Sequence, residues 1–123
     1  MGWKLILLPL LALSLLAMTG TAAADDIEVD LDAPDYARSG ETVPVTIEIE
    51  HEDTAPGRYV DTVRLYDGDT LLKEWRYGPD DYVKAEEWTL SYSGAFDRDA
   101  YLRATAHSTV YGDDTDTERI RIR

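Results

Sequence analysis

Apolar residues alternate with polar ones along most of the chain after residue 26, which is the pattern of strands that bury one face. The clearest run is TVPVTIEIEH at 42–51, in which Val43, Val45, Ile47 and Ile49 share one phase. No stretch after residue 26 shows the helical period of about 3.6 residues. The alternation predicts seven strands, at 27–31, 43–50, 60–66, 70–76, 86–92, 99–110 and 117–123.

Short strands with glycine, proline or aspartate turns between them are typical of β-sandwiches. Seven of them favour an all-β, immunoglobulin-like β-sandwich of about seven antiparallel strands over a barrel. Residues 25–123 are about a hundred residues long, which suits one domain. We therefore expect residues 25–123 to form a single immunoglobulin-like domain.

The first 24 residues read as a cleaved signal peptide. Lys4 precedes an apolar run, and 22–24 supply the small residues of a cleavage site before Asp25. Pro9 interrupts the apolar run, which is shorter than the roughly 20 residues of a membrane-spanning helix. A cleaved signal peptide is therefore favoured over a retained membrane anchor. These features predict an exported protein (secreted, periplasmic or cell-surface) with no membrane span after cleavage.

The net negative charge of the chain excludes two classes of binding partner. The chain carries a net charge of −13, and removing 1–24 removes only Lys4 among the charged residues, leaving 25 acidic and 11 basic side chains at −14. Such a field repels nucleic acid and anionic lipid, which excludes both as main partners. Few lysines and many aspartates suit a halophilic protein that stays soluble in high salt.

The chain has no cysteine, so disulfides and lipid attachment are both excluded.

Several other residues attract attention. The acidic run 113–118 is the best calcium candidate, although a solvated turn is the expected reading. Trp75 and Trp88 are expected to pack on the core, and Tyr101 to have a structural role at a sandwich corner. The arginines of 119–123 are expected to protect an exposed edge strand from pairing with another molecule. No glycine-rich phosphate loop, H-E-x-x-H or G-x-S-x-G motif is present.

A set of positions spread over most of the domain carries a family resemblance. They are APD at 33–35, GE at 40–41, VT at 45–46, His51 and VRLY at 63–66. With them the chain resembles the iron-binding domain of the desulfoferrodoxin and neelaredoxin superoxide reductases, and in second place the Z subunit of the sulfur-oxidation carrier. The first resemblance implies an immunoglobulin-like sandwich and iron held by four histidines and one cysteine thiolate.

Most of the ligand positions implied by the resemblance are changed. His51 matches the first histidine of the family's loop motif, whereas the second falls at about Arg58, with Tyr59 beside it. The late cysteine and histidine correspond to Ser108 and Tyr111. A serine hydroxyl is no substitute for a thiolate, and Arg58 brings a fixed positive charge. We therefore expect no superoxide reductase activity.

The leading hypothesis is an exported binding module without catalysis or cofactor. It binds a protein or a small ligand outside the cytoplasm, at a rim formed by His51, Arg58, Tyr59, Ser108 and Tyr111. A second hypothesis is a redox or metal-handling protein in which His51 and His107, with a carboxylate, bind iron, zinc or copper. A third is a partner subunit of a sulfur carrier.

Overall fold

The computed structural model describes residues 26–123, so the predicted signal peptide 1–24 lies outside the described residues. The described part contains strands and no helix, and none of it forms a helix long and apolar enough to cross a membrane. The strands are β2 (Ile27–Asp32), β3 (Tyr36–Ala37), β4 (Thr42–His51), β5 (Val60–Asp67), β6 (Thr70–Arg76), β7 (Glu87–Ala95), β8 (Ala100–Ser108) and β9 (Gly112–Ile122).

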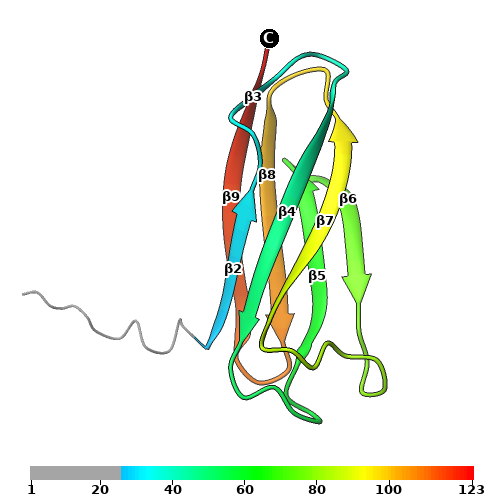
Figure 1. Cartoon of the computed structure of the whole chain (residues 1–123), viewed down its shortest axis with the longest axis vertical. Coiled ribbons are helices and arrows are strands. Elements are labelled where there is room, and N and C mark those ends of the chain that lie inside the picture. The colour runs from blue at the N-terminus through cyan, green and yellow to red at the C-terminus, as the bar shows by residue number, and fades with distance from the viewer. Residues whose placement is uncertain (1–25) are drawn as a thin grey trace, which may run out of the picture.

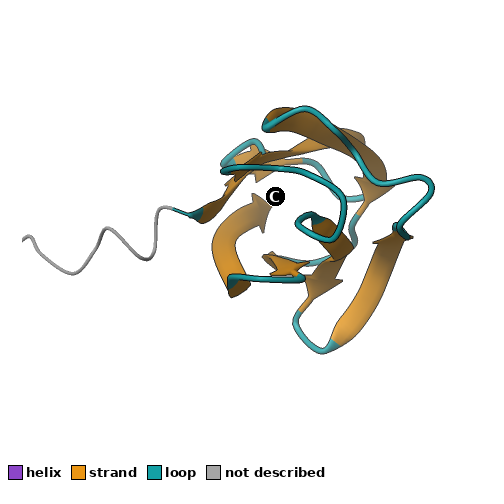
Figure 2. Ribbon diagram, turned by 90° about the horizontal axis from the view of Figure 1, so that it is seen from below, coloured by secondary structure: helices purple, strands orange, loops and turns teal. Residues whose placement is uncertain are grey.

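The strands form two sheets that face each other, as Figures 1 and 2 show. One sheet has the order β2-β4-β7 and the other β3-β9-β8-β5-β6. Neighbouring strands are antiparallel except β3 and β9, which pair in parallel through two residues each. The predicted immunoglobulin-like β-sandwich is therefore confirmed, with one short strand, β3, that the alternation pattern did not predict.

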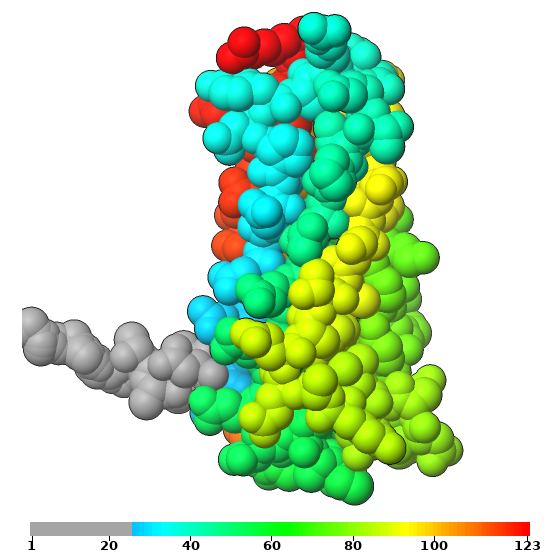
Figure 3. All heavy atoms as spheres, viewed as in Figure 1, coloured from blue at the N-terminus to red at the C-terminus, as the bar shows by residue number. Residues whose placement is uncertain are grey.

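The core lies between the sheets and follows from the alternation. Along β4 every second residue is buried, including Ile47 and Ile49, which are 0% exposed, and the last of them is His51. The facing strands β5 and β8 bury Val63, Leu65, Leu102, Ala104 and Ala106 in the same way. Trp75 and Trp88 are partly buried against this core, as expected. The space-filling view in Figure 3 shows the outer side of the smaller sheet, where β2, β4 and β7 run next to one another.

One side of the sandwich is joined by carboxylates. Asp114 and Asp116 on β9 accept hydrogen bonds from the backbone N–H groups of Val29 (2.8 Å) and Leu31 (2.7 Å) on β2. The run 113–118 is thus part of a long strand, which corrects the reading of it as a turn or a calcium site. Its inward aspartates satisfy amides that an edge strand would otherwise leave unpaired.

The C-terminal arginines do not protect a bare edge, because β9 pairs with β8 on one side and with β3 at Arg121 on the other. The guanidinium of Arg119 lies 5.1 Å from the ring centre of Tyr101 and bonds Asp99 at 2.7 Å, while Arg123 lies 3.9 Å from the ring centre of Tyr36. Tyr101 is 54% exposed, so its ring lies on the outer sheet surface and not in a buried corner.

Candidate functional site

Three loops meet at one end of the sandwich, the lower end in Figure 1. We call it the basal end; its loops are 52–59, 77–86 and 109–111. His51 is the last residue of β4 and Ser108 the last of β8. These two strands lie in opposite sheets and both end here, so their final side chains meet across the core.

His51 and Ser108 form a buried pair. Each is 2% exposed, and the Nε2 atom of His51 lies 2.8 Å from the Oγ atom of Ser108. The other ring nitrogen, Nδ1, lies 3.1 Å from the Oγ1 atom of Thr54. Both nitrogens of the imidazole therefore have partners within the protein.

The hydrogen positions follow from counting donors. The Oγ atom of Ser108 accepts the backbone N–H groups of Val110 and Tyr111, both at 3.1 Å, so its own hydrogen is left to bond Nε2 of His51. The hydroxyl of Thr54 donates to the carbonyl oxygen of His51 (3.0 Å), so it accepts from Nδ1–H. We assign His51 as the neutral imidazole with its proton on Nδ1.

The electrostatic environment agrees with a neutral ring. Burial lowers the pKa of His51 below its ordinary value, because a charged imidazolium would lose its hydration, and the positive charge of Arg58 lowers this pKa further. The carboxylate of Glu86 acts in the opposite direction. His51 is accordingly a hydrogen-bonded core residue near neutral pH.

Tyr111 and Arg58 cover this pair. The ring of Tyr111 lies over His51 with 5.1 Å between ring centres, and its hydroxyl accepts a hydrogen bond from Nη2 of Arg58 at 2.9 Å. The guanidinium also bonds the carbonyl oxygen of Asp53 (3.3 Å) and lies 5.6 Å from the Tyr111 ring centre. Asp53 has a φ of 53°, the left-handed region, which turns the loop back towards Arg58.

Tyr59 belongs to the same end but is held differently. Its side chain is buried at 8% exposure and stacks on Tyr82 of the 77–86 loop, with 4.9 Å between ring centres. Its backbone exchanges bonds with Thr109, whose hydroxyl accepts from the N–H of Tyr59 at 3.1 Å. The sequence did not single out Thr54, Tyr82 or Thr109. Of these three residues, only Thr54 could have been predicted from the sequence, because it lies three residues after His51 and a threonine at that distance can bond back to it.

The structure does not bring His107 to this cluster. His107 and Ser108 are consecutive on a strand, so their side chains point to opposite faces. The imidazole of His107 lies half exposed on the outer sheet surface, 2.7 Å from Asp61 and 3.8 Å from Asp113. The structure therefore places His51 in the core and His107 on the outer surface and does not bring the two imidazoles together.

The remaining residues at the basal end do not fit iron. No group of three or more histidine, cysteine, aspartate or glutamate side chains in residues 26–123 is placed to hold a metal ion. Binding through His51 requires breaking the bond between Ser108 and Nε2, and Arg58 opposes a nearby cation. At the positions where the resemblance implies donors, Ser108 bonds His51 and Arg58 bonds Tyr111.

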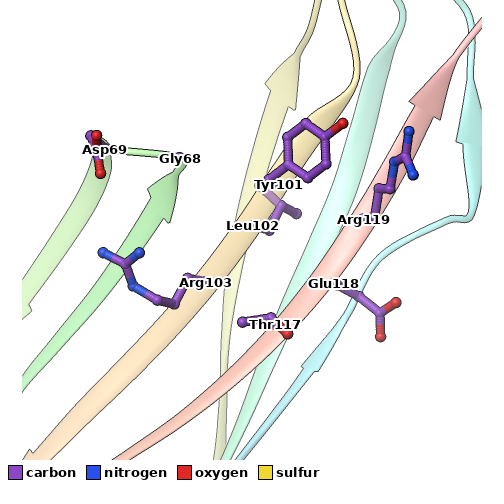
Figure 4. A pocket seen from close by; sticks show the side chains of 8 residues that line it. All are labelled: Gly68, Asp69, Tyr101, Leu102, Arg103, Thr117, Glu118 and Arg119. Atoms are coloured by element: carbon purple, nitrogen blue, oxygen red, sulfur yellow. The ribbon is translucent and has the colours of Figure 1, made fainter.

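A cavity of about 470 Å³ lies elsewhere, on the outer face of the larger sheet (Figure 4). Tyr101, Arg103 and Arg119 line it, and Arg103 stacks 4.5 Å from the ring centre of Tyr66. Figure 4 shows Glu118 turned away from the two arginines. The cavity shares no residue with the His51 cluster.

Comparison with known proteins supports the fold. No family model and no curated protein matches the sequence. The superoxide reductase (neelaredoxin) from Ignicoccus hospitalis matches the structure with a TM-score of 0.70 and 12% identity over 85% of this chain and 89% of that one. The sulfur carrier protein SoxY from Chlorobium limicola f thiosulfatophilum gives 0.58 and 13%, over 77% and 78%. The CARDB domain of a Pyrococcus furiosus protein gives 0.62 and 18%, over 79% and 94%.

At these identities the comparisons show a shared fold and nothing finer. The fold of the superoxide reductases, which the sequence resemblance implied, is confirmed. The second similarity in fold is to the sulfur carrier protein SoxY, whereas the sequence resemblance named the Z subunit. Residues 26–123 thus form a β-sandwich with the fold of the neelaredoxins.

Proposed function

We propose that this protein is an exported binding module that has kept the superoxide reductase scaffold without its chemistry. The observation that carries the proposal is the bond of 2.8 Å between Nε2 of His51 and Oγ of Ser108. It joins the one matching histidine directly to the residue that stands where the resemblance implies the thiolate. The protein binds its partner at the basal end, through the residues that cover the buried pair of His51 and Ser108.

The geometry favours a protein partner over a small ligand at this site. His51 and Ser108 are each 2% exposed, so a ligand does not reach them. What the basal end offers instead is the surface of Arg58 and Tyr111, two residue types that are enriched at the energetically important points of protein interfaces. Their mutual hydrogen bond holds both side chains in place before binding, which reduces the entropy lost on association.

The loss of metal chemistry is tested by loading. Untagged protein is incubated with ferrous iron, freed of excess metal, and measured for bound iron and for consumption of superoxide. We expect neither. A double variant, Ser108→Cys with Arg58→His, restores two of the replaced donors and serves as the comparison. Stoichiometric iron with superoxide consumption in the unaltered protein would overturn the proposal.

The binding surface is tested by site-specific photo-crosslinking in the protein's native extracellular fraction. A photoreactive residue at Tyr111 should capture one reproducible protein, and Arg58→Ala should weaken that capture. The same residue at Thr115, which is exposed on the outer face of the larger sheet, is the matched control. Equal capture of the same protein from both positions would contradict a basal binding surface.

A further inference from the structure

The strand β7 is an unprotected sheet edge. It pairs with β4 on one side, and its other side has no strand partner in the described chain. Residues 88–95, WTLSYSGA, contain no charged residue and no proline, although 30% of the chain is charged. The pairing with β4 runs without a register shift, so β7 has no bulge either.

The other edges of the sandwich are protected. β2 carries three acidic residues, and β9 carboxylates accept its backbone N–H groups at Val29 and Leu31. β6 carries Lys73, Glu74 and Arg76. Natural proteins protect edge strands in these ways because an unpaired, uncharged edge recruits another strand. The missing protection on β7 indicates that a strand covers it in the working protein.

We propose that the strand is β7 of a second copy, paired antiparallel about a twofold axis at Ser91, so that the two small sheets form one continuous sheet of six strands. Closed dimers of this kind are the commonest assemblies of soluble proteins, and the same patch serves both copies. Figure 3 shows β7, in yellow, on the side of the smaller sheet away from β2.

The side chains of β7 complement their own twofold image. With the axis at Ser91, the acidic Glu87 of one copy lies opposite Ala95 of the other, so the two Glu87 carboxylates stay apart. A parallel arrangement would place them side by side. On the outward face, Thr89 meets Ser93, a pairing of hydroxyl side chains that suits neighbouring strands. Every outward position between 88 and 94 is small and uncharged.

The inward face agrees with the same register. Trp88 of one copy lies opposite Gly94 of the other, a residue without a side chain that is covered by the ring of its own Tyr92, so the indole meets that ring. Next to Gly94 the molecule has a cavity of about 620 Å³, which is lined by apolar residues such as Leu72 and Phe96 and by the charged Asp67, Asp97 and Arg98. The indole of the second copy therefore arrives beside a recess with both apolar and charged walls. An axis displaced by one residue would lose this match.

Single-cysteine variants test the proposal, because the chain has no cysteine of its own. Residues opposite each other in antiparallel strands have Cα atoms about 4.5–5.5 Å apart, within the range that a disulfide spans. Under mild oxidation most of Ser91→Cys should become a covalent dimer. Thr89→Cys and Ser93→Cys should link when mixed, and each much less alone. Thr115→Cys, exposed on the other sheet, is the control.

Sedimentation of the unaltered protein gives an independent result. We expect a dimer that Ser91→Lys converts to monomer and Thr115→Lys leaves intact, with both variants folded as judged by their circular dichroism spectra. Because the interface is uncharged and each copy is strongly negative, salt should strengthen the dimer by screening the repulsion. A monomer at all concentrations, a dimer that survives Ser91→Lys, or Ser91→Cys crosslinking no better than Thr115→Cys would overturn the proposal.

Discussion

Ser108 determines the hydrogen bonding of the buried His51. Its single oxygen accepts two backbone N–H groups and donates to His51, so it completes the turn into β9 and fixes the tautomer of the imidazole. Sequence alone placed His51 near a rim, because the strand ends there. It did not show the burial, because the covering groups, Tyr111 and Arg58, come from loops more than fifty residues apart.

We expect Ser108→Ala to destabilise the protein by about 1 to 3 kcal/mol, because it leaves a buried ring nitrogen and two amides without a partner. Thr105→Ala is the matched control. Its hydroxyl bonds that of Thr115 on the outer face, and surface changes of this kind usually stay within about 0.5 kcal/mol. Urea unfolding measures both. Equal losses would show that Ser108 has no special role.

The lowered pKa of His51 makes stability depend on pH. An unfolded chain takes up a proton on this ring near the ordinary value of 6.5, whereas the folded chain resists protonation. Between the two pKa values the unfolded state binds more protons, so the stabilisation is present above the unfolded value and is lost as pH falls through the folded one. His51→Gln should flatten the pH dependence of unfolding below about pH 6.5. A slope unaffected by His51→Gln but abolished by His107→Gln would contradict this assignment.

At the scale of elements, the alternation of apolar residues predicted the long strands because each buries one face. It missed β3, whose two residues are too few to show a period. It also shortened β9, since an acidic run is typical of a solvated turn. The aspartates are tolerated on the inward face of β9 because the backbone of β2 supplies them with hydrogen-bond donors, a long-range contact invisible in local sequence.

Removing these carboxylates should open that side of the sandwich. We expect Asp114→Ala and Asp116→Ala each to cost about 1 to 3 kcal/mol, because each removes a charged acceptor from a backbone amide. The amides of Val29 and Leu31 should then exchange hydrogen faster. Asp113→Ala, on the outward face of the same strand, is the control. Unchanged exchange at both amides would show that the carboxylates do not hold the two strands together.

At the scale of the whole molecule, the charge is unevenly distributed. Carboxylates crowd the outer face of the smaller sheet, where a hydrogen bond with Glu87 and then burial and neighbouring glutamates raise the pKa of Glu50. Several arginines occupy the outer face of the larger sheet. The sequence gives the total charge, but the separation of signs appears only when the strands are paired.

Crowded like charges destabilise the folded state until they are screened. We therefore expect the melting temperature to rise as sodium chloride is added, and a rise of about 4 to 8 °C corresponds to roughly 1 kcal/mol for a domain of this size. Glu50→Gln should reduce the salt response, whereas Thr42→Gln, an uncharged change at an exposed position of β4, should not. A melting temperature that falls with salt would mean that attractive ion pairs outweigh the repulsion.

We propose that His51 is a neutral, hydrogen-bonded core residue and not a metal ligand. Nitrogen-15 NMR of the histidine side chains, recorded with and without ferrous iron under anaerobic conditions, tests it most directly. We expect Nδ1 of His51 protonated, Nε2 unprotonated, and no change on adding iron. A stoichiometric, metal-dependent shift or loss of the His51 signals, with the exposed His107 unaffected, would contradict the account.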